Sequence, residues 1–107
     1  MAIRYEVILT DKAKEELEGI YNYISKSLLS KNTANNVMKR IENKILNLTQ
    51  IPESYSIIEP YTQTNEKYRK LIINNYIVVY RIDYDNNKVY VIRIIYGKRN
   101  YLNEEFE

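Results

Sequence analysis

The chain has 107 residues, 45% of them hydrophobic, and a formal net charge of only +2, which fits one domain with one modest core and leaves no room for two. It contains neither cysteine nor histidine, so disulfides, thiolate nucleophiles, zinc–thiolate sites and histidine acid–base catalysis are excluded. Only scattered carboxylates remain as metal ligands, and we expect no metal and no cofactor.

The start of the chain predicts a strand followed by two helices. Residues 3–9 alternate between apolar and polar side chains, as a strand does. Thr10 stands at a helix N-cap position, and apolar residues at steps of three and four then predict an amphipathic helix over residues 11–29. A second apolar stripe over 34–48 predicts another helix. The short polar link at 30–33 predicts that the two helices form an antiparallel hairpin.

The second half of the chain predicts a β-meander. Residues 53–66 are rich in polar groups and are expected to be an irregular connection. Three runs joined by Asn-rich turns then predict strands, at residues 67–73, 76–83 and 89–96. The predicted fold is one α+β domain over residues 1–107: an N-terminal strand, an antiparallel helical hairpin and a three-stranded antiparallel meander. We expect a single antiparallel sheet with the hairpin on one face.

One face of this sheet is predicted to be apolar yet uncovered. Strict alternation turns Tyr80, Ile82, Ile92 and Ile94 towards the helices. It groups six apolar residues on the opposite face, namely Leu71, Ile73, Ile77, Val79, Val91 and Ile95. Arginines rim that face: Arg69, Arg81 and Arg93. An apolar outer face predicts a binding surface, unless residues 53–66 or the C-terminal tail fold over it.

The positive charge is concentrated in the C-terminal third. Residues 1–66 carry 8 basic and 9 acidic side chains, whereas residues 67–99 carry 8 basic and 2 acidic ones, a net charge of +6. The last residues add three glutamates. This asymmetry indicates an anionic partner at the C-terminal third, although scattered Lys and Arg on a sheet are also typical of an ordinary solvated surface. The N-terminus has no signal peptide pattern and no stretch is long enough to span a membrane, so we expect a cytoplasmic protein.

Two phrases resemble a known superfamily. The first resembles the opening of ParE-type toxins: Val7-Ile8-Leu9-Thr10, Ala13, Glu16-Leu17, Ile20 and Tyr23-Ile24. The second is similar to the shared core of the RelE/ParE toxins: Tyr68-Arg69-Lys70-Leu71, then Asn75 to Asp83, and then Val91 to Tyr101. The resemblance covers nearly the whole chain. It implies a toxin of a type II toxin–antitoxin system, linked to plasmid stabilization and growth inhibition, whose protein antitoxin wraps it and alone connects it to operator DNA.

The superfamily resemblance implies two alternative activities. RelE-like members cut mRNA in the ribosome without a metal, using a basic strand pair, a strand arginine and a late arginine and tyrosine. By register, Arg69 and Arg99 match two of these positions, but Leu71 and Ile77 occupy two others. The residues that would serve a nuclease are Arg69, Arg81, Tyr96, Arg99 and Tyr101.

ParE-like members bind and poison DNA gyrase without being nucleases, and this activity is our prediction. We expect basic residues to contact the target: Arg69, Arg81, Arg93, Lys98 and Arg99. The six apolar residues of the outer face are expected to bind the antitoxin. An mRNA endonuclease that acts on the ribosome, or an inactive toxin-fold co-repressor, remains the alternative.

Overall fold

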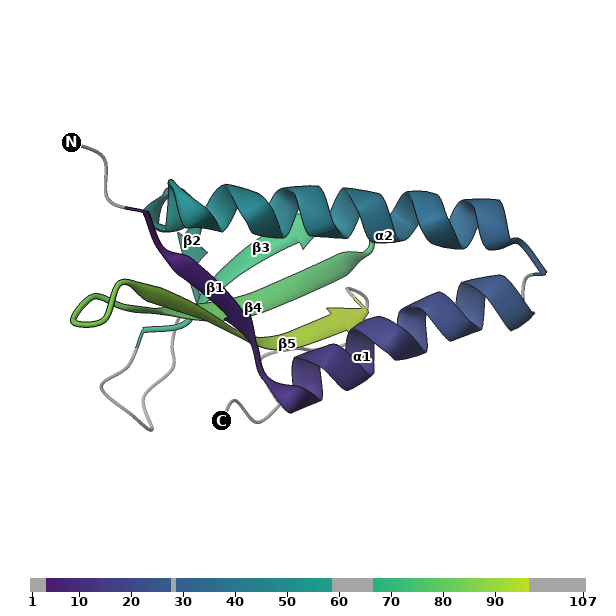
Figure 1. Cartoon of the computed structure of the whole chain (residues 1–107), viewed down its shortest axis with the longest axis horizontal. Coiled ribbons are helices and arrows are strands. Elements are labelled where there is room, and N and C mark those ends of the chain that lie inside the picture. Colours follow the sequence, from purple (N-terminus) through teal and green to yellow (C-terminus); the bar gives the residue numbers. More distant parts are fainter. Residues whose placement is uncertain (1–3, 28, 59–66, 97–107) are drawn as a thin grey trace.

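The computed structural model describes residues 4–27, 29–58 and 67–96 (Figure 1). In chain order the elements are β1 (Glu6–Leu9), α1 (Asp11–Asn22), a π-helix (Tyr23–Ser27), α2 (Lys31–Leu46), short 3₁₀ turns at Asn47–Thr49 and Pro52–Ser54, β2 (Ser56–Ile57), β3 (Arg69–Ile73), β4 (Tyr76–Asp83) and β5 (Lys88–Tyr96). The predicted strand, helical hairpin and meander are confirmed. No helix of the described segments is long and apolar enough to cross a membrane.

The sheet has five strands in the order β1-β5-β4-β3-β2. Three of its four pairings are antiparallel, but β1 lies parallel to β5, with Glu6 opposite Lys88 and Leu9 opposite Val91. The expectation of a purely antiparallel sheet is therefore wrong, because the N-terminal strand pairs with the last strand in the same direction. The segment expected to be irregular also contributes β2, which pairs with the start of β3.

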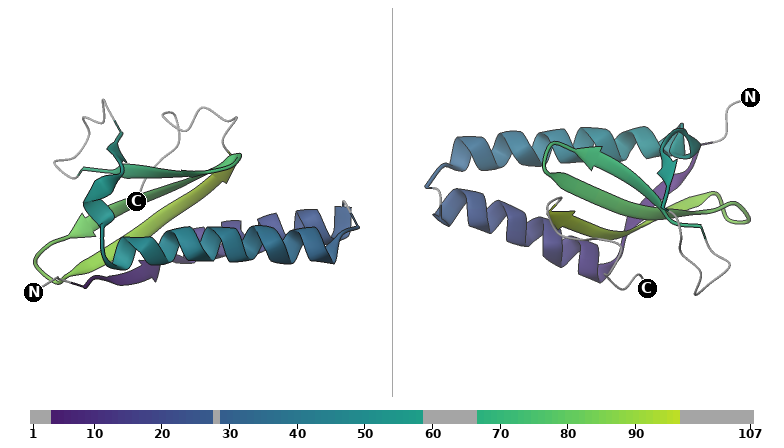
Figure 2. Two further views of the ribbon diagram at one scale, coloured as in Figure 1. Left: turned by 90° about the horizontal axis from the view of Figure 1, so that it is seen from above. Right: turned by 180° about the vertical axis from the view of Figure 1, so that it is seen from behind.

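The helical hairpin covers one face of the sheet and extends beyond its end (Figures 1 and 2). Thr10 caps α1, since its hydroxyl oxygen accepts a hydrogen bond from the amide of Ala13. The helix predicted over 11–29 is regular only to Asn22 and then widens into the π-helix. Ser30 caps α2 and begins it earlier than the predicted polar link allows.

The main core lies between the hairpin and the sheet. The strands contribute buried side chains to it, among them Leu71, Ile73, Val78, Tyr80, Val89, Val91 and Ile94. The helices contribute Ala13, Ile41, Ile45 and, just after α2, Leu48. The predicted stripes of both helices therefore face the sheet, as their periodicity indicates.

The face assignment of the predicted strands is wrong in part, because β5 contains a β-bulge. Val79 pairs with Arg93 and Tyr80 pairs with Val91, so Ile92 is an extra residue. One extra residue reverses the alternation on either side of it. Ile92 consequently lies on the outer face, while Val91 faces the helices. In β3, the register opposite Val78 turns Leu71 and Ile73 towards the helices as well.

The outer face is closed rather than open. A second buried cluster lies there and consists of Ile58, Tyr68, Ile77, Val79, Ile92 and Ile95. Each of these side chains is at most 5% exposed in the chain alone. The predicted uncovered apolar surface is therefore wrong. Ile58, from the segment that follows β2, and Tyr68, just before β3, pack into this cluster, which is the alternative that the sequence left open.

We predict opposite sensitivities for two neighbours in β3. Leu71 is 2% exposed in the main core, whereas Ile72 is 58% exposed. Leu71→Ala should lower the free energy of unfolding by about 2–5 kcal/mol because it leaves a cavity. Ile72→Ala should cost less than about 1 kcal/mol. Urea unfolding of both variants measures the difference, and equal losses would contradict the observed faces of β3.

Candidate functional site

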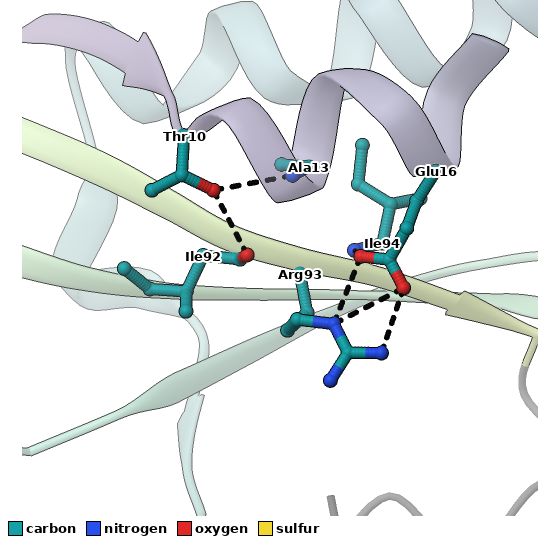
Figure 3. Close-up of polar contacts among 6 residues, drawn as sticks. All are labelled: Thr10, Ala13, Glu16, Ile92, Arg93 and Ile94. Carbon is teal, nitrogen blue, oxygen red and sulfur yellow. Dashed lines mark hydrogen bonds and ion pairs between the residues drawn. The ribbon is translucent and has the colours of Figure 1, made fainter. Parts of the chain in front are cut away.

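A buried carboxylate joins α1 to the edge of β5. Glu16 accepts hydrogen bonds from Nε of Arg93 at 2.9 Å and from its Nη2 at 2.8 Å, and also from the backbone amide of Ile94 at 3.0 Å (Figure 3). Six residues earlier, the Thr10 hydroxyl donates to the carbonyl of Ile92 at 3.0 Å. Side chains of α1 thus satisfy the edge of β5 beyond Val91, where the pairing with β1 ends.

This ion pair is largely removed from water. The side chains of Arg93 and Glu16 are 10% and 14% exposed, and the two groups share a forked, charge-assisted contact. A pair of this kind adds little net stability compared with an apolar pair, but losing one partner leaves a buried charge uncompensated. Arg93, predicted to contact the target, is therefore largely buried in a contact with α1.

The other two strand arginines lie elsewhere, so the predicted rim of three does not form. Arg69 donates through Nη1 to the carbonyls of Glu53 and Tyr55, at 3.2 and 2.8 Å. Arg81 lies on the outer face of the sheet, away from the helices, and its guanidinium carbon is 4.5 Å from the centroid of the Tyr90 ring. Among the predicted target-binding residues that the structure describes, only Arg81 places its guanidinium against an aromatic ring on the outer face of the sheet.

Hydrogen bonds from Tyr80 and Arg69 hold the turn that precedes β2. The Tyr80 hydroxyl donates to the carbonyl of Pro52, beside the carbonyls held by Arg69. Burial raises the pKa of Tyr80 far above its ordinary value, although the nearby Arg69 charge opposes this. The phenol therefore stays protonated and remains a hydrogen-bond donor throughout the physiological pH range.

An open groove of about 510 Å³ lies between α1 and the end of the sheet. One wall comes from the helical segment and consists of Glu16, Gly19, Ile20 and Tyr23; the other comes from β4 and β5 and consists of Tyr76, Ile94 and Tyr96. The strands rise away from the hairpin at this end of the molecule (Figure 2). The groove lies where the two layers separate.

Aromatic rings dominate the groove. Tyr76 and Tyr96 meet edge to face with centroids 5.8 Å apart, and Tyr96 is 45% and Tyr23 60% exposed. Burial, and then the neighbouring phenols of Tyr96 and Tyr23, raise the pKa of Tyr76. The phenols of Tyr23 and Tyr96 therefore lie near that of Tyr76. Two large exposed aromatic side chains at the mouth of an apolar groove are typical of a protein-binding surface.

The groove contains one residue that the sequence indicated and several that it did not. Tyr96 was expected to serve a nuclease, and the structure places it in the groove. Glu16 and Tyr23 belong to the phrase that resembles ParE toxins, yet nothing in their local pattern assigned them a site. Lys98, Arg99 and Tyr101 lie outside the described residues.

Comparisons with known proteins agree with this architecture. Residues 7–101 match the family described as the ParE toxin of the type II toxin–antitoxin system parDE. None of the curated proteins matches the chain in sequence.

Solved structures share the fold at low sequence identity. A chain of the chromosomal ParDE system of P. aeruginosa has a TM-score of 0.69 and 17% identity, with 87% of this chain and 96% of that chain covered. A chain of the RelBE2 toxin–antitoxin complex of Mycobacterium tuberculosis has a TM-score of 0.59, 18% identity and coverages of 88% and 92%. A chain of the RelE–RelB complex of Pyrococcus horikoshii OT3 has a TM-score of 0.61, 14% identity and coverages of 90% and 98%.

The helical hairpin on a mixed five-stranded sheet is the fold of RelE/ParE toxins. Within that class the match over residues 7–101 is decisive, and the chain belongs to the family of ParE toxins of type II toxin–antitoxin systems. The resemblance that the two sequence phrases indicated is confirmed.

We predict that removing one partner of the ion pair is strongly destabilising. Glu16→Ala should lower the free energy of unfolding by about 3–5 kcal/mol, because it strands the buried Arg93 guanidinium and the Ile94 amide. Glu18→Ala, on the exposed face of the same helix, is the matched control and should change it by less than about 0.5 kcal/mol. Urea unfolding measures both, and similar effects of the two changes would show that the pair is dispensable.

A second prediction concerns Gly19, which lines the groove in the middle of α1. A Cβ built at this residue meets no heavy atom within 4 Å. Gly19→Ala should therefore stabilise the chain by about 0.5–1 kcal/mol, since alanine is the better helix former. Thermal or urea unfolding tests this. A loss of stability would mean that the fold itself requires glycine there.

Proposed function

We propose that this toxin arrests growth by binding DNA gyrase and trapping it on cleaved DNA, and that a protein antitoxin neutralises it in the cytoplasm. Membership of the ParE toxin family supports a ParE-type rather than a RelE-type activity. The antitoxin partner is supported by the structural relatives from Mycobacterium tuberculosis and Pyrococcus horikoshii, which are themselves described as toxin–antitoxin complexes. Contact with operator DNA would then pass through the antitoxin.

The choice between gyrase poisoning and mRNA cleavage rests on which residues occupy the positions that a nuclease needs, and on what those residues contact. Leu71 and Ile77, which stand where RelE-like enzymes carry cations, are 2% and 5% exposed and belong to the two cores. Arg69, which matches another such position, is bonded to two backbone carbonyls. Stabilising a phosphorane requires donors aimed at its oxygens, and losing one such donor costs about 10²–10³ in rate. These residues favour gyrase poisoning over mRNA cleavage.

The proposed target contacts are accordingly Arg81 together with Lys98 and Arg99, with Arg69 and Arg93 acting by holding the strands in place. The six residues first expected to bind the antitoxin are buried in the chain alone. An antitoxin that binds the folded toxin therefore has to contact other, exposed groups, and the aromatic groove between α1 and the end of the sheet offers such a surface.

We predict that the purified toxin converts supercoiled plasmid into linear DNA with gyrase present, once detergent and protease release the trapped complex. Ribosome-bound mRNA should stay intact in a parallel translation reaction. Codon-specific cuts at the ribosomal A site without any gyrase effect would reverse the assignment and favour the RelE-like nuclease. Absence of both effects, together with normal growth during expression, would favour the inactive co-repressor.

Arg99→Ala should weaken gyrase trapping and toxicity at least tenfold while antitoxin rescue persists. Lys39→Ala, an exposed charge removal on α2, is the matched control and should leave both unchanged. Co-expression with the small protein encoded beside the toxin measures rescue and identifies the antitoxin. Full toxicity of Arg99→Ala would remove this residue from the target contact.

A further inference from the structure

On the outer face of the sheet, one guanidinium is paired with an aromatic ring. Arg81 and Tyr90 lie directly opposite each other in the β4–β5 pairing, and the guanidinium carbon of Arg81 is 4.5 Å from the centroid of the Tyr90 ring. At this distance the electron-rich face of the ring attracts the positive charge. A guanidinium carries several N–H donors around its edge, so contact with one ring is compatible with donation to a carboxylate or phosphate.

The ring itself is held by the apolar cluster of the outer face. Tyr90 is half-buried and packs against that cluster, which includes Ile92 and Ile95. Tyr90 and Ile95 are an odd number of positions apart, so they share a face only because the bulge at Ile92 reverses the alternation. Bulges are common next to functional sites, where they redirect a side chain. The bulge in β5 therefore gives Arg81 an anchored aromatic neighbour.

A nearby carboxylate is engaged elsewhere. Asp83 lies two residues further along β4, and its oxygens accept hydrogen bonds from the backbone amide and the side-chain amide of Asn86, at 3.2 and 2.9 Å. These bonds belong to the turn between β4 and β5. The contact that orients the Arg81 guanidinium across the strands is thus the one with the ring of Tyr90.

We propose that Tyr90 is a positioning residue, which holds Arg81 in the place where its guanidinium binds an anionic group of the toxin's target. That this target is gyrase rests on the proposed function, whereas the role of the ring rests on its contact with Arg81. A flexible side chain that is held in its bound position beforehand loses less entropy on association. Removing the ring should therefore weaken target binding even though the charge of Arg81 is unchanged.

The first measurement asks whether the ring holds the guanidinium in the free toxin. Isotope-labelled full-length toxin is made by cell-free synthesis to avoid toxicity. The ring current of Tyr90 should move the side-chain proton signals of Arg81 upfield in the NMR spectrum. Tyr90→Phe should keep this shift and Tyr90→Leu should remove it. Unshifted Arg81 signals in the wild type would overturn the proposal.

The second measurement is the affinity of each variant for immobilised gyrase without DNA. Tyr90→Leu should weaken binding about threefold to tenfold, and Tyr90→Phe should restore the wild-type affinity. Tyr84→Leu is the matched control, because Tyr84 is 55% exposed just beyond β4 and its hydroxyl contacts Glu53, and it should leave the affinity unchanged. Urea unfolding confirms that each variant is folded in the assay.

A double-mutant cycle separates positioning from a general structural role. In the Arg81→Ala background, Tyr90→Leu should cause no further loss of affinity, since the ring then has no guanidinium to hold. Equal losses in both backgrounds would overturn the proposal. So would an undiminished affinity of Tyr90→Leu, or a loss in Tyr90→Phe as large as that in Tyr90→Leu.

Growth arrest by the same variants distinguishes failure of this inference from failure of the proposed target. If Arg81 and Tyr90 are coupled in growth arrest but the wild type does not bind gyrase, the proposed target is overturned and the inference stands. If the wild type binds gyrase and the two residues act independently, the inference fails and the target stands. A wild type that neither binds gyrase nor arrests growth would overturn both.

Discussion

The carboxylate of Glu16 fixes the relation between the helices and the sheet. β1 pairs with β5 only as far as Leu9 and Val91, so the edge of β5 beyond this point would expose unpaired backbone groups. Thr10 supplies a donor for Ile92 and Glu16 supplies an acceptor for Ile94, in the place where a longer β1 would have paired. Natural sheets are commonly protected at their edges in this way, by covering elements rather than by further strands.

The same contact determines where the groove opens. Because α1 is held to β5 at Glu16, the helix can diverge from the sheet only beyond this residue. Ile20 and Tyr23 line the groove from the helical side and Ile94 and Tyr96 line it from β5. The strands rise away from the helices at this end of the molecule (Figure 2). The groove therefore opens beside the contact between Glu16 and Arg93.

The sequence was sufficient to predict the helices and strands, but it was not sufficient to predict which side chains lie on each face of the sheet. Residues 76–83 were predicted as a strand and form β4 with those limits, because alternation and the flanking Asn turns are local signals. The bulge at Ile92 has no such signal, yet it decides which side chains of β5 face the helices. Strict alternation therefore placed Val91 on the outer face. The predicted open surface is wrong for a separate reason, because Ile58 and Tyr68 pack into the apolar cluster on that face.

The site shows a similar division between local and distant information. Tyr96 could be singled out because it lies at a strand end within a phrase that resembles RelE/ParE toxins. The contact between Glu16 and Arg93 joins residues 77 positions apart, and no periodicity in either segment reports it. Tyr76 lies opposite Tyr96 through the β4–β5 pairing, but Tyr23 joins them in the groove only when the helical segment packs beside the end of the sheet. Composition offered no help, since 12 tyrosines are spread along the chain.

Closure of both sheet faces changes what an antitoxin has to do. An open apolar face would make the toxin a partner in coupled folding, with a core completed only in the complex. Here Val79 and Ile95 on one face and Val78 and Ile94 on the other are all at most 2% exposed without any partner. A ligand that binds such a folded chain stabilises it further by mass action but is not required for its core. A partner of such a chain covers an exposed surface and does not complete either core.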